Sequence, residues 1–114
     1  MSVPLRRGAI VWVDLNPSRG REQAGTRPAV VISCDGYLDN VPNLAIIVPI
    51  TTTARGWPHH VPISGAGTGL ARRSFAMTEQ PRTITRERIS RRAGTAPASS
   101  MREIDQWLRD FTDL

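Results

Sequence analysis

Arg27 is the residue of this sequence whose type and setting best suit phosphate chemistry. It ends the polar segment Glu22-Gln-Ala-Gly-Thr-Arg-Pro28, directly before an apolar run. A guanidinium group is permanently charged and can donate two parallel hydrogen bonds to phosphate oxygens. Pro28 restricts the backbone of Arg27 to an extended conformation, which would fix the arginine where loop and strand meet. Thr51 follows another apolar run and offers a hydroxyl that could bind the same phosphate.

Each of these polar residues also has a simpler structural explanation. Arg27 could be a surface arginine that pairs with Glu22, and a glutamate in a charged loop is usually just solvated. Thr51 is one of three successive threonines, and a hydroxyl that caps a strand end would explain it equally well. From these residues alone both interpretations stay open.

His59 and His60 are the two histidines of the chain, and histidine is the usual acid and base near neutral pH. Adjacent residues on a strand point to opposite faces, so at most one of the two is expected to reach a groove. A metal site formed by the pair is not expected either, because neighbouring side chains on a strand diverge. We therefore expect both histidines at the surface.

Composition and charge limit the classes of protein to which this chain can belong. The chain has 114 residues, enough to bury one modest core, so we expect a single domain over residues 1–114. Its net charge is +5 and all fifteen basic residues are arginines. Both features favour nucleic acid as a partner. A GC-rich genome would give the same bias toward arginine. The apolar stretch 9–13 is too short for a signal peptide or a membrane span, which predicts a cytoplasmic protein.

Cys34 is the one cysteine, so neither an internal disulfide nor a multi-cysteine zinc site is possible. It ends the apolar run 29–34, and this setting predicts a packed, inert thiol.

Short β-branched runs bounded by Gly, Pro, Asn or Asp predict strands at 9–15, 29–33 and 44–50. The run 44–50 is apolar on both faces, which predicts a central strand that is covered on both sides. Pro49 near its end indicates a bulge or the point where pairing stops. Weaker strand patterns lie at 60–64, 74–80 and 88–90.

Two polar, glycine-containing segments separate these runs. The loop 16–26 is long and charged, and loops of that kind tend to be functional. The segment 65–69 contains three glycines but is followed by a strand pattern, so no helix N-terminus is available to hold an anion. We expect this segment to be a flexible turn.

The last segment predicts one good helix. Ser100 and Glu103 have the spacing of a capping box, and five apolar residues then follow at helical spacing: Met101, Ile104, Trp107, Leu108 and Phe111. This stripe predicts packing of the helix against a sheet. The fold class expected is therefore mostly β with a C-terminal α-helix, in a small, strongly curved sheet or barrel.

The sequence resembles the MazF/PemK-type toxins over nearly its whole length. The matching segments, in the order of that family, are 7–17, 20–33, Val48-Pro-Ile-Thr-Thr52, Gly56-Trp-Pro58, Glu79-Gln80 with Thr83-Ile84, and the C-terminal helix. The stretch Glu-Gln-x-Gly-x-Arg-Pro followed by an apolar strand is the most specific of them. The resemblance implies the SH3-like small barrel with a helix that CcdB-type and MazF-type toxins share.

The resemblance also implies an activity: a sequence-specific, metal-independent endoribonuclease that needs no cofactor. Such toxins cut single-stranded RNA by attack of the ribose 2'-hydroxyl, which leaves a 2',3'-cyclic phosphate and a 5'-hydroxyl. The chain would act as a homodimer with RNA in a groove across the two subunits, and a cognate antitoxin would block that groove.

Residue roles carried over from the resemblance are expectations of the same kind. Arg27 and Thr51 would be the catalytic pair, with Glu22 a further catalytic candidate as the base. Residues expected to contact RNA are Arg21, Gln23, Thr52, Gln80 and Arg82. The sequence departs from the family pattern at Arg21, at Pro81 and in the short loop 35–43, which puts the RNA sequence that is cut in doubt.

Two other functions are weighed against this one. A CcdB-like toxin would bind DNA gyrase without catalysis, but those toxins lack the Glu-Gln-x-Gly-x-Arg-Pro motif. A noncatalytic RNA-binding module would need exposed aromatic residues for base stacking. The chain has six aromatic residues, and most are expected in the core.

Overall fold

Strand β3 (Leu44–Thr51) is the central element of the computed structural model, which describes residues 5–15 and 26–113. Along one edge it pairs with β2 (Arg27–Val31), and β1 (Ala9–Val13) follows beyond β2. The other edge of β3 pairs first with β6 (Arg82–Thr85), over Leu44–Ile47, and then with β5 (Ser74–Met77), from Ile50. All of these pairs are antiparallel. Pro49 lies between the two partners, as expected of a residue without a backbone donor.

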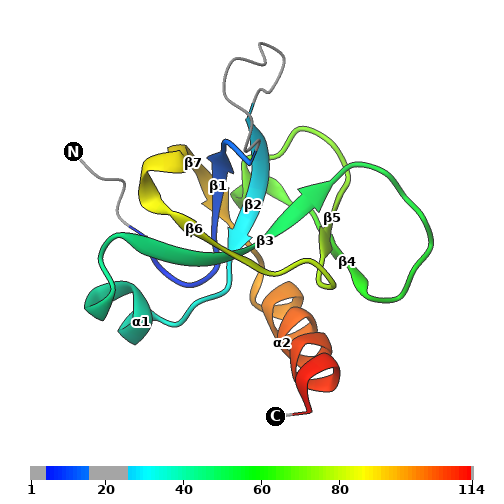
Figure 1. Ribbon diagram of the computed structural model, residues 1–114. Helices are drawn as coiled ribbons and strands as arrows, with labels where there is room; N and C mark the ends of the chain where they lie inside the picture. The colour runs from blue at the N-terminus through cyan, green and yellow to red at the C-terminus, as the bar shows by residue number, and fades with distance from the viewer. Residues whose placement is uncertain (1–4, 16–25, 114) are drawn as a thin grey trace.

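The outer strands complete one bent sheet in the order β4-β5-β3-β2-β1-β7, with β6 attached to β3 (Figure 1). The remaining elements are β4 (His60–Ile63), β7 (Ile89–Thr95), the helices α1 (Asp35–Asn40) and α2 (Ala98–Thr112), and the 3₁₀ turns η1 (Ala66–Thr68) and η2 (Arg86–Arg88). Among the described residues, no helix is long and apolar enough to cross a membrane.

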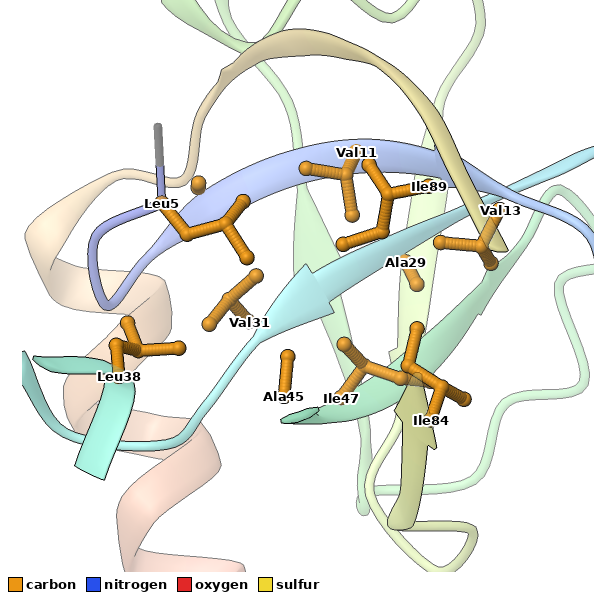
Figure 2. Packing of buried hydrophobic residues seen from close by; sticks show 11 residues of the cluster. Leu5, Val11, Val13, Ala29, Val31, Leu38, Ala45, Ile47, Ile84 and Ile89 are labelled. Carbon is orange, nitrogen blue, oxygen red and sulfur yellow. The ribbon is translucent and has the colours of Figure 1, made fainter. Parts of the chain in front are cut away.

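Residues that alternate along β1, β2 and β3 build two separate cores. The first core lies between these strands, β6, β7 and α1, and its members include Val11, Val31, Leu38, Ile47, Ile84 and Ile89 (Figure 2). The second core lies on the opposite face, beneath β4, β5 and α2, and includes Ile10, Val30, Val48, Val61 and Ile104. Both faces of the central strands are thus buried, which explains their continuous apolar runs. The expected covered central strand is confirmed.

The predicted strands are all present, with ends that shift by a few residues. The expected class, mostly β with a C-terminal helix, is confirmed. The sequence pattern missed two short elements. In β6 only Ile84 is buried, so the apolar alternation was too weak to detect. Helix α1 has six residues, with Leu38 its one buried side chain.

Helix α2 begins earlier than the capping box predicted. Pro97 is the N-cap residue, and no side chain caps the first turn. Ser100 lies inside the helix, where its buried hydroxyl donates a hydrogen bond of 3.0 Å to the carbonyl of Pro62 in β4. The apolar stripe is buried at Met101 and Ile104, but Phe111 is 49% exposed. Trp107 and Leu108 are half-buried and also pack against the second core, so of the five predicted positions only Phe111 is left largely uncovered.

Cys34 is exposed, so the prediction of a packed thiol was wrong. Strand β2 ends at Val31, which removes Cys34 from the apolar strand. The residue instead forms the N-cap of α1, where its sulfur accepts a hydrogen bond from the backbone N–H of Tyr37 at 3.4 Å.

The glycine-rich segment 65–69 contains the 3₁₀ turn η1, and its backbone lies in close contact with β7. A Cβ atom on Gly69 would overlap the carbonyl of Ala93 in β7, and one on Gly94 would overlap the carbonyl of Gly67. Gly69 also has a φ of +71°, in the left-handed region that glycine favours. Thr68 is buried, and its hydroxyl donates to the carbonyl of Gly65. Gly69 and Gly94 are thus required for a backbone-to-backbone contact between this segment and β7.

We expect Gly94→Ala to destabilise the protein by about 2 kcal/mol or more, because its methyl group would force two backbone segments apart. Gly67→Ala is the matched control, since a Cβ atom there meets no atom within 4 Å and should change stability by less than about 0.5 kcal/mol. Urea unfolding of both variants measures the difference. Equal stability of the two variants would contradict the packed contact.

Candidate functional site

The register of β2 against β3 brings Arg27 and Thr51 to the same end of the sheet. Ala29 is opposite Pro49 in this antiparallel pair, and continuing the register by two residues places Arg27 opposite Thr51. Arg27 is the first residue of β2 and is exposed, whereas Thr51 is the last residue of β3 and is half-buried. The extended conformation imposed by Pro28 is the one observed, since Arg27 already pairs with Val13 of β1.

A surface cavity of about 360 Å³ lies where these strand ends meet, and both residues line it. Three sides come from the strands, through Trp12, Pro28 and Ile50. The remaining wall is the segment from the packed glycine turn to the start of β5. Its lining residues are Gly69, Leu70, Ala71, Arg72 and Ser74. The cavity thus combines a sheet edge with a wall held by backbone contact.

The charge around this cavity suits an anion. Its described lining residues include Arg27 and Arg72 and no acidic side chain. A third arginine lies beside it, because the guanidinium of Arg91 in β7 stacks 5.0 Å from the ring centre of Trp12. Thr51 contributes a hydroxyl group to the cavity, and its Oγ1 accepts a hydrogen bond of 3.1 Å from the backbone N–H of Thr53. Cations and hydroxyls at a partly apolar cavity can bind a phosphate and the base beside it.

The structure places the other predicted site residues in three groups. Thr52 lines the cavity with Arg27 and Thr51. Glu22, Arg21 and Gln23 lie outside the described residues. Gln80 and Arg82 do not line this cavity. Gln80 follows β5 and donates to Glu79, while Arg82 is an exposed residue that pairs with Ile47 at the far part of β3. Their predicted contacts with RNA stay predictions.

Sequence reasoning missed Trp12 and Arg72 as cavity residues. Trp12 was not singled out because most aromatic residues were expected in the core, but its ring is half-buried and lines the cavity. More generally, the expectation that most aromatic residues are buried was wrong. Of the six, Phe75 alone is buried, and Trp57 and Phe111 are the most exposed. Arg72 is one of fifteen arginines, and no motif in the sequence around it singled it out.

His59, His60 and Glu79 form a second cluster, which corrects the prediction of two diverging surface histidines. His60 is 4% exposed, and its Nε2 atom lies 3.1 Å from Oε2 of Glu79. Nε2 of His59 lies 3.5 Å from Oε1 of the same carboxylate. Strand β4 begins only at His60, so His59 belongs to the preceding turn. The alternation that would separate neighbouring side chains therefore does not apply.

Glu79 is held as a carboxylate by this cluster. Partial burial on its own would raise the pKa of Glu79. This effect is outweighed by hydrogen bonds to the carboxylate from His60, from the backbone of Glu79 and from the side chain of Gln80. The net result is a lowered pKa of Glu79. Aromatic rings surround the two imidazoles, with Trp57 stacked on His59 at 5.5 Å and edge-on to His60 at 4.8 Å. Trp107 and Phe111 of α2 meet His59 edge-on.

Comparison with known proteins identifies relatives over nearly the full chain. The family model described as PemK-like, MazF-like toxin of type II toxin-antitoxin system matches residues 6–112. Endoribonuclease MazF9 of Mycobacterium tuberculosis is 37% identical, over 96% of this chain and 98% of its own. Endoribonuclease toxin MazF of Escherichia coli is also 37% identical, over 85% of this chain and 84% of its own.

A solved structure supports the same relationship. A crystal structure of MazE-MazF from Deinococcus radiodurans superposes with a TM-score of 0.82 and 27% identity, covering 100% of this chain and 99% of that one. The sheet-plus-helix arrangement expected from the sequence resemblance is therefore confirmed. The relatives named are endoribonucleases, which favours the first of the three functions weighed above over gyrase binding or noncatalytic RNA binding.

We expect Glu79→Gln to lower stability most above about pH 5. A carboxylate with a lowered pKa stabilises the fold above its unfolded pKa of 4.5, and this stability is lost as the pH falls through the folded pKa. The stability difference between wild type and variant should therefore shrink between about pH 5 and pH 3. Urea unfolding across this range measures it, with Glu103→Gln as the control at an exposed carboxylate on α2. A difference that grows on acidification would contradict the hydrogen-bonded carboxylate.

Proposed function

We propose that this chain is a sequence-specific, metal-independent endoribonuclease toxin. The premise is that the chain belongs to the PemK-like, MazF-like toxins of type II toxin-antitoxin systems. Its substrate would be single-stranded RNA, cut in the cytoplasm with arrest of growth. The observation that carries the proposal is the cavity shared by Arg27 and Thr51.

The proposed reaction is an internal phosphotransfer. The ribose 2'-oxygen attacks the adjacent phosphorus, the bond from phosphorus to the 5'-oxygen breaks, and a proton is delivered to that oxygen. The products are a 2',3'-cyclic phosphate and a 5'-hydroxyl. Negative charge increases on the non-bridging oxygens of the phosphorane, so preorganised cationic donors stabilise the transition state more than the substrate.

Arg27 is proposed to supply this charge stabilisation. It is fixed at the start of β2 by Pro28 and by pairing with Val13, and its exposed guanidinium borders the cavity. The strand fixes the backbone of this donor, so only the side chain has to be ordered when it binds phosphate. Thr51 is proposed to donate its hydroxyl to the same phosphate, because its oxygen already accepts from Thr53 and its proton is available.

Proton transfer must come from other groups, since an arginine keeps its charge at any ordinary pH. Glu22 is the proposed base, on the strength of the family resemblance. Arg21, Gln23, Thr52, Gln80 and Arg82 are proposed to contact the RNA. Thr52 lines the cavity, and the exposed Arg82 has a side chain able to bind a phosphate farther along the strand.

A cognate antitoxin and a second copy of the chain are the proposed protein partners. The MazF of the Deinococcus structure was crystallised with MazE, which supports an antitoxin of that type. A dimer is supported by the apolar surface at the C-terminal end of α2, which the core leaves uncovered at Phe111. Phe111 is exposed there, and a cavity of about 240 Å³ lies between it, Leu108 and Pro81. A partner subunit would remove this surface from water.

We expect Arg27→Ala to lower the rate of RNA cleavage by at least about two orders of magnitude, the scale of losing one transition-state charge contact. Purified protein is incubated with a mixed RNA in EDTA, and new 5' ends are mapped. Arg102→Ala, at an exposed arginine of α2, is the control and should cut at the wild-type rate. Intact RNA with wild-type protein, or unchanged cutting by Arg27→Ala, would refute the proposed function.

We expect Thr51→Ala to slow cleavage by about tenfold or more, the worth of one hydrogen bond to a charged group, whereas Thr51→Ser should keep most of the activity. Single-turnover rates with a short cleavable RNA separate this effect from binding. Thr83→Ala, at an exposed threonine of β6, is the matched control. Equal rates for Thr51→Ala and Thr83→Ala would leave the Thr51 hydroxyl without a role in catalysis.

A further inference from the structure

We propose that His59, His60 and Glu79 form a binding site for a divalent transition-metal ion of the zinc class, separate from the proposed cleavage site. Two imidazoles and one carboxylate, all from one end of the β4–β5 hairpin, converge on a single point. They include both histidines of the chain.

The distances between the three donors fit a common ion. One ligand atom from each residue can be chosen so that all three lie within 4.8 Å of one another. The two Nε2 atoms lie 3.5 and 3.1 Å from separate oxygens of Glu79. In a tetrahedral zinc site with bonds of about 2.0–2.1 Å, neighbouring donors are about 3.3–3.4 Å apart. Small side-chain adjustments would therefore give all three donors bonding distances.

The donor set selects the kind of ion. Imidazole nitrogen suits zinc, nickel and copper, whereas magnesium and calcium prefer sites built from oxygen alone. Two histidines and a glutamate are a donor set that zinc uses with water in its fourth position. Glu79 already accepts hydrogen bonds as a carboxylate and has no proton to lose, whereas the proton on Nε2 of His60 would shift to Nδ1 or leave to solvent when the ion binds.

An ion can reach the three side chains from solvent, and the imidazoles are restrained in position. His60 is almost fully buried, whereas the side chains of His59 and Glu79 are 27% and 30% exposed, which leaves an open side for the ion. Rings of Trp57, Trp107 and Phe111 limit the movement of His59. Two of the three donors are thus restrained before an ion arrives, which lowers the entropy cost of binding.

A bound ion would cross-link two turns of the chain. It would tie the turn before β4 to the turn after β5, next to the C-terminal end of α2. Its distance from the cleavage cavity follows from the hairpin register. His60 pairs with Met77, while the cavity residue Ser74 pairs with Ile63 at the other end of the same two strands, about 10 Å away at the usual rise per residue. The proposed RNA cleavage does not use this ion.

Calorimetric titration of Zn²⁺ into untagged, EDTA-stripped and dialysed protein tests the proposal, because a polyhistidine tag would itself bind the ion. We expect one ion per chain and a rise in Tm of about 10 °C when free Zn²⁺ is 100-fold above its Kd. Absence of saturable binding would overturn the proposal.

Glu79→Gln and His59→Gln should each weaken Zn²⁺ binding by at least about tenfold and reduce the Tm rise, since each removes one of three ligands. Both side chains are partly exposed, and the metal-free Tm of each variant establishes that it folds. Glu103→Gln makes the same chemical change at an exposed site outside the cluster and should bind like wild type. Unchanged affinity in both cluster variants would place the ion elsewhere and refute the site.

Discussion

The pairing of β3 is the constraint on which the rest of the molecule depends. One edge of this strand is occupied by β2, and the other is shared by β6 and β5, with the change of partner at Pro49. The change lets one continuous strand belong to both halves of the bent sheet and face both cores. It also sets the position of Thr51 relative to Arg27 and to β5, so the cavity that these two residues line is a product of strand register rather than of any single loop.

The β4–β5 hairpin connects two regions of different chemistry. One end contributes Ser74 to a cavity that is rich in arginine, and the other end holds a carboxylate between two imidazoles. The second core lies beneath the hairpin, with Val61 and Ile63 fully buried against Ile104 of α2. A rigid hairpin of this kind keeps the two groups of polar residues apart, so that each is positioned by backbone pairing and not by contact with the other.

Sequence patterns predicted the parts of this protein that depend on local period and local chemistry. The three apolar runs became β1, β2 and β3, and the Arg27-Pro28 junction lies where the proline restriction placed it. The errors arose where tertiary position overrides local pattern. His60 is buried and meets Glu79 from the turn after β5, and Ser100 donates to β4 instead of capping its own helix. Trp12 and Arg72 come to line one cavity only when the sheet has bent. None of these contacts has a sequence period that would reveal it.

The close contact between the segment 65–69 and β7 has a consequence for how such a protein can diverge. Gly69 borders the cavity and touches the backbone of Ala93, and Gly94 touches the backbone of Gly67 in return. Each glycine leaves room for the backbone of the other segment. A larger residue at one of these positions alone, or a change in the length of this wall, would therefore disturb the packing between the two segments. The side chains of Ala71 and Arg72 line the cavity outside this contact, so they can vary, and change what the cavity binds, while the wall that carries them stays the same.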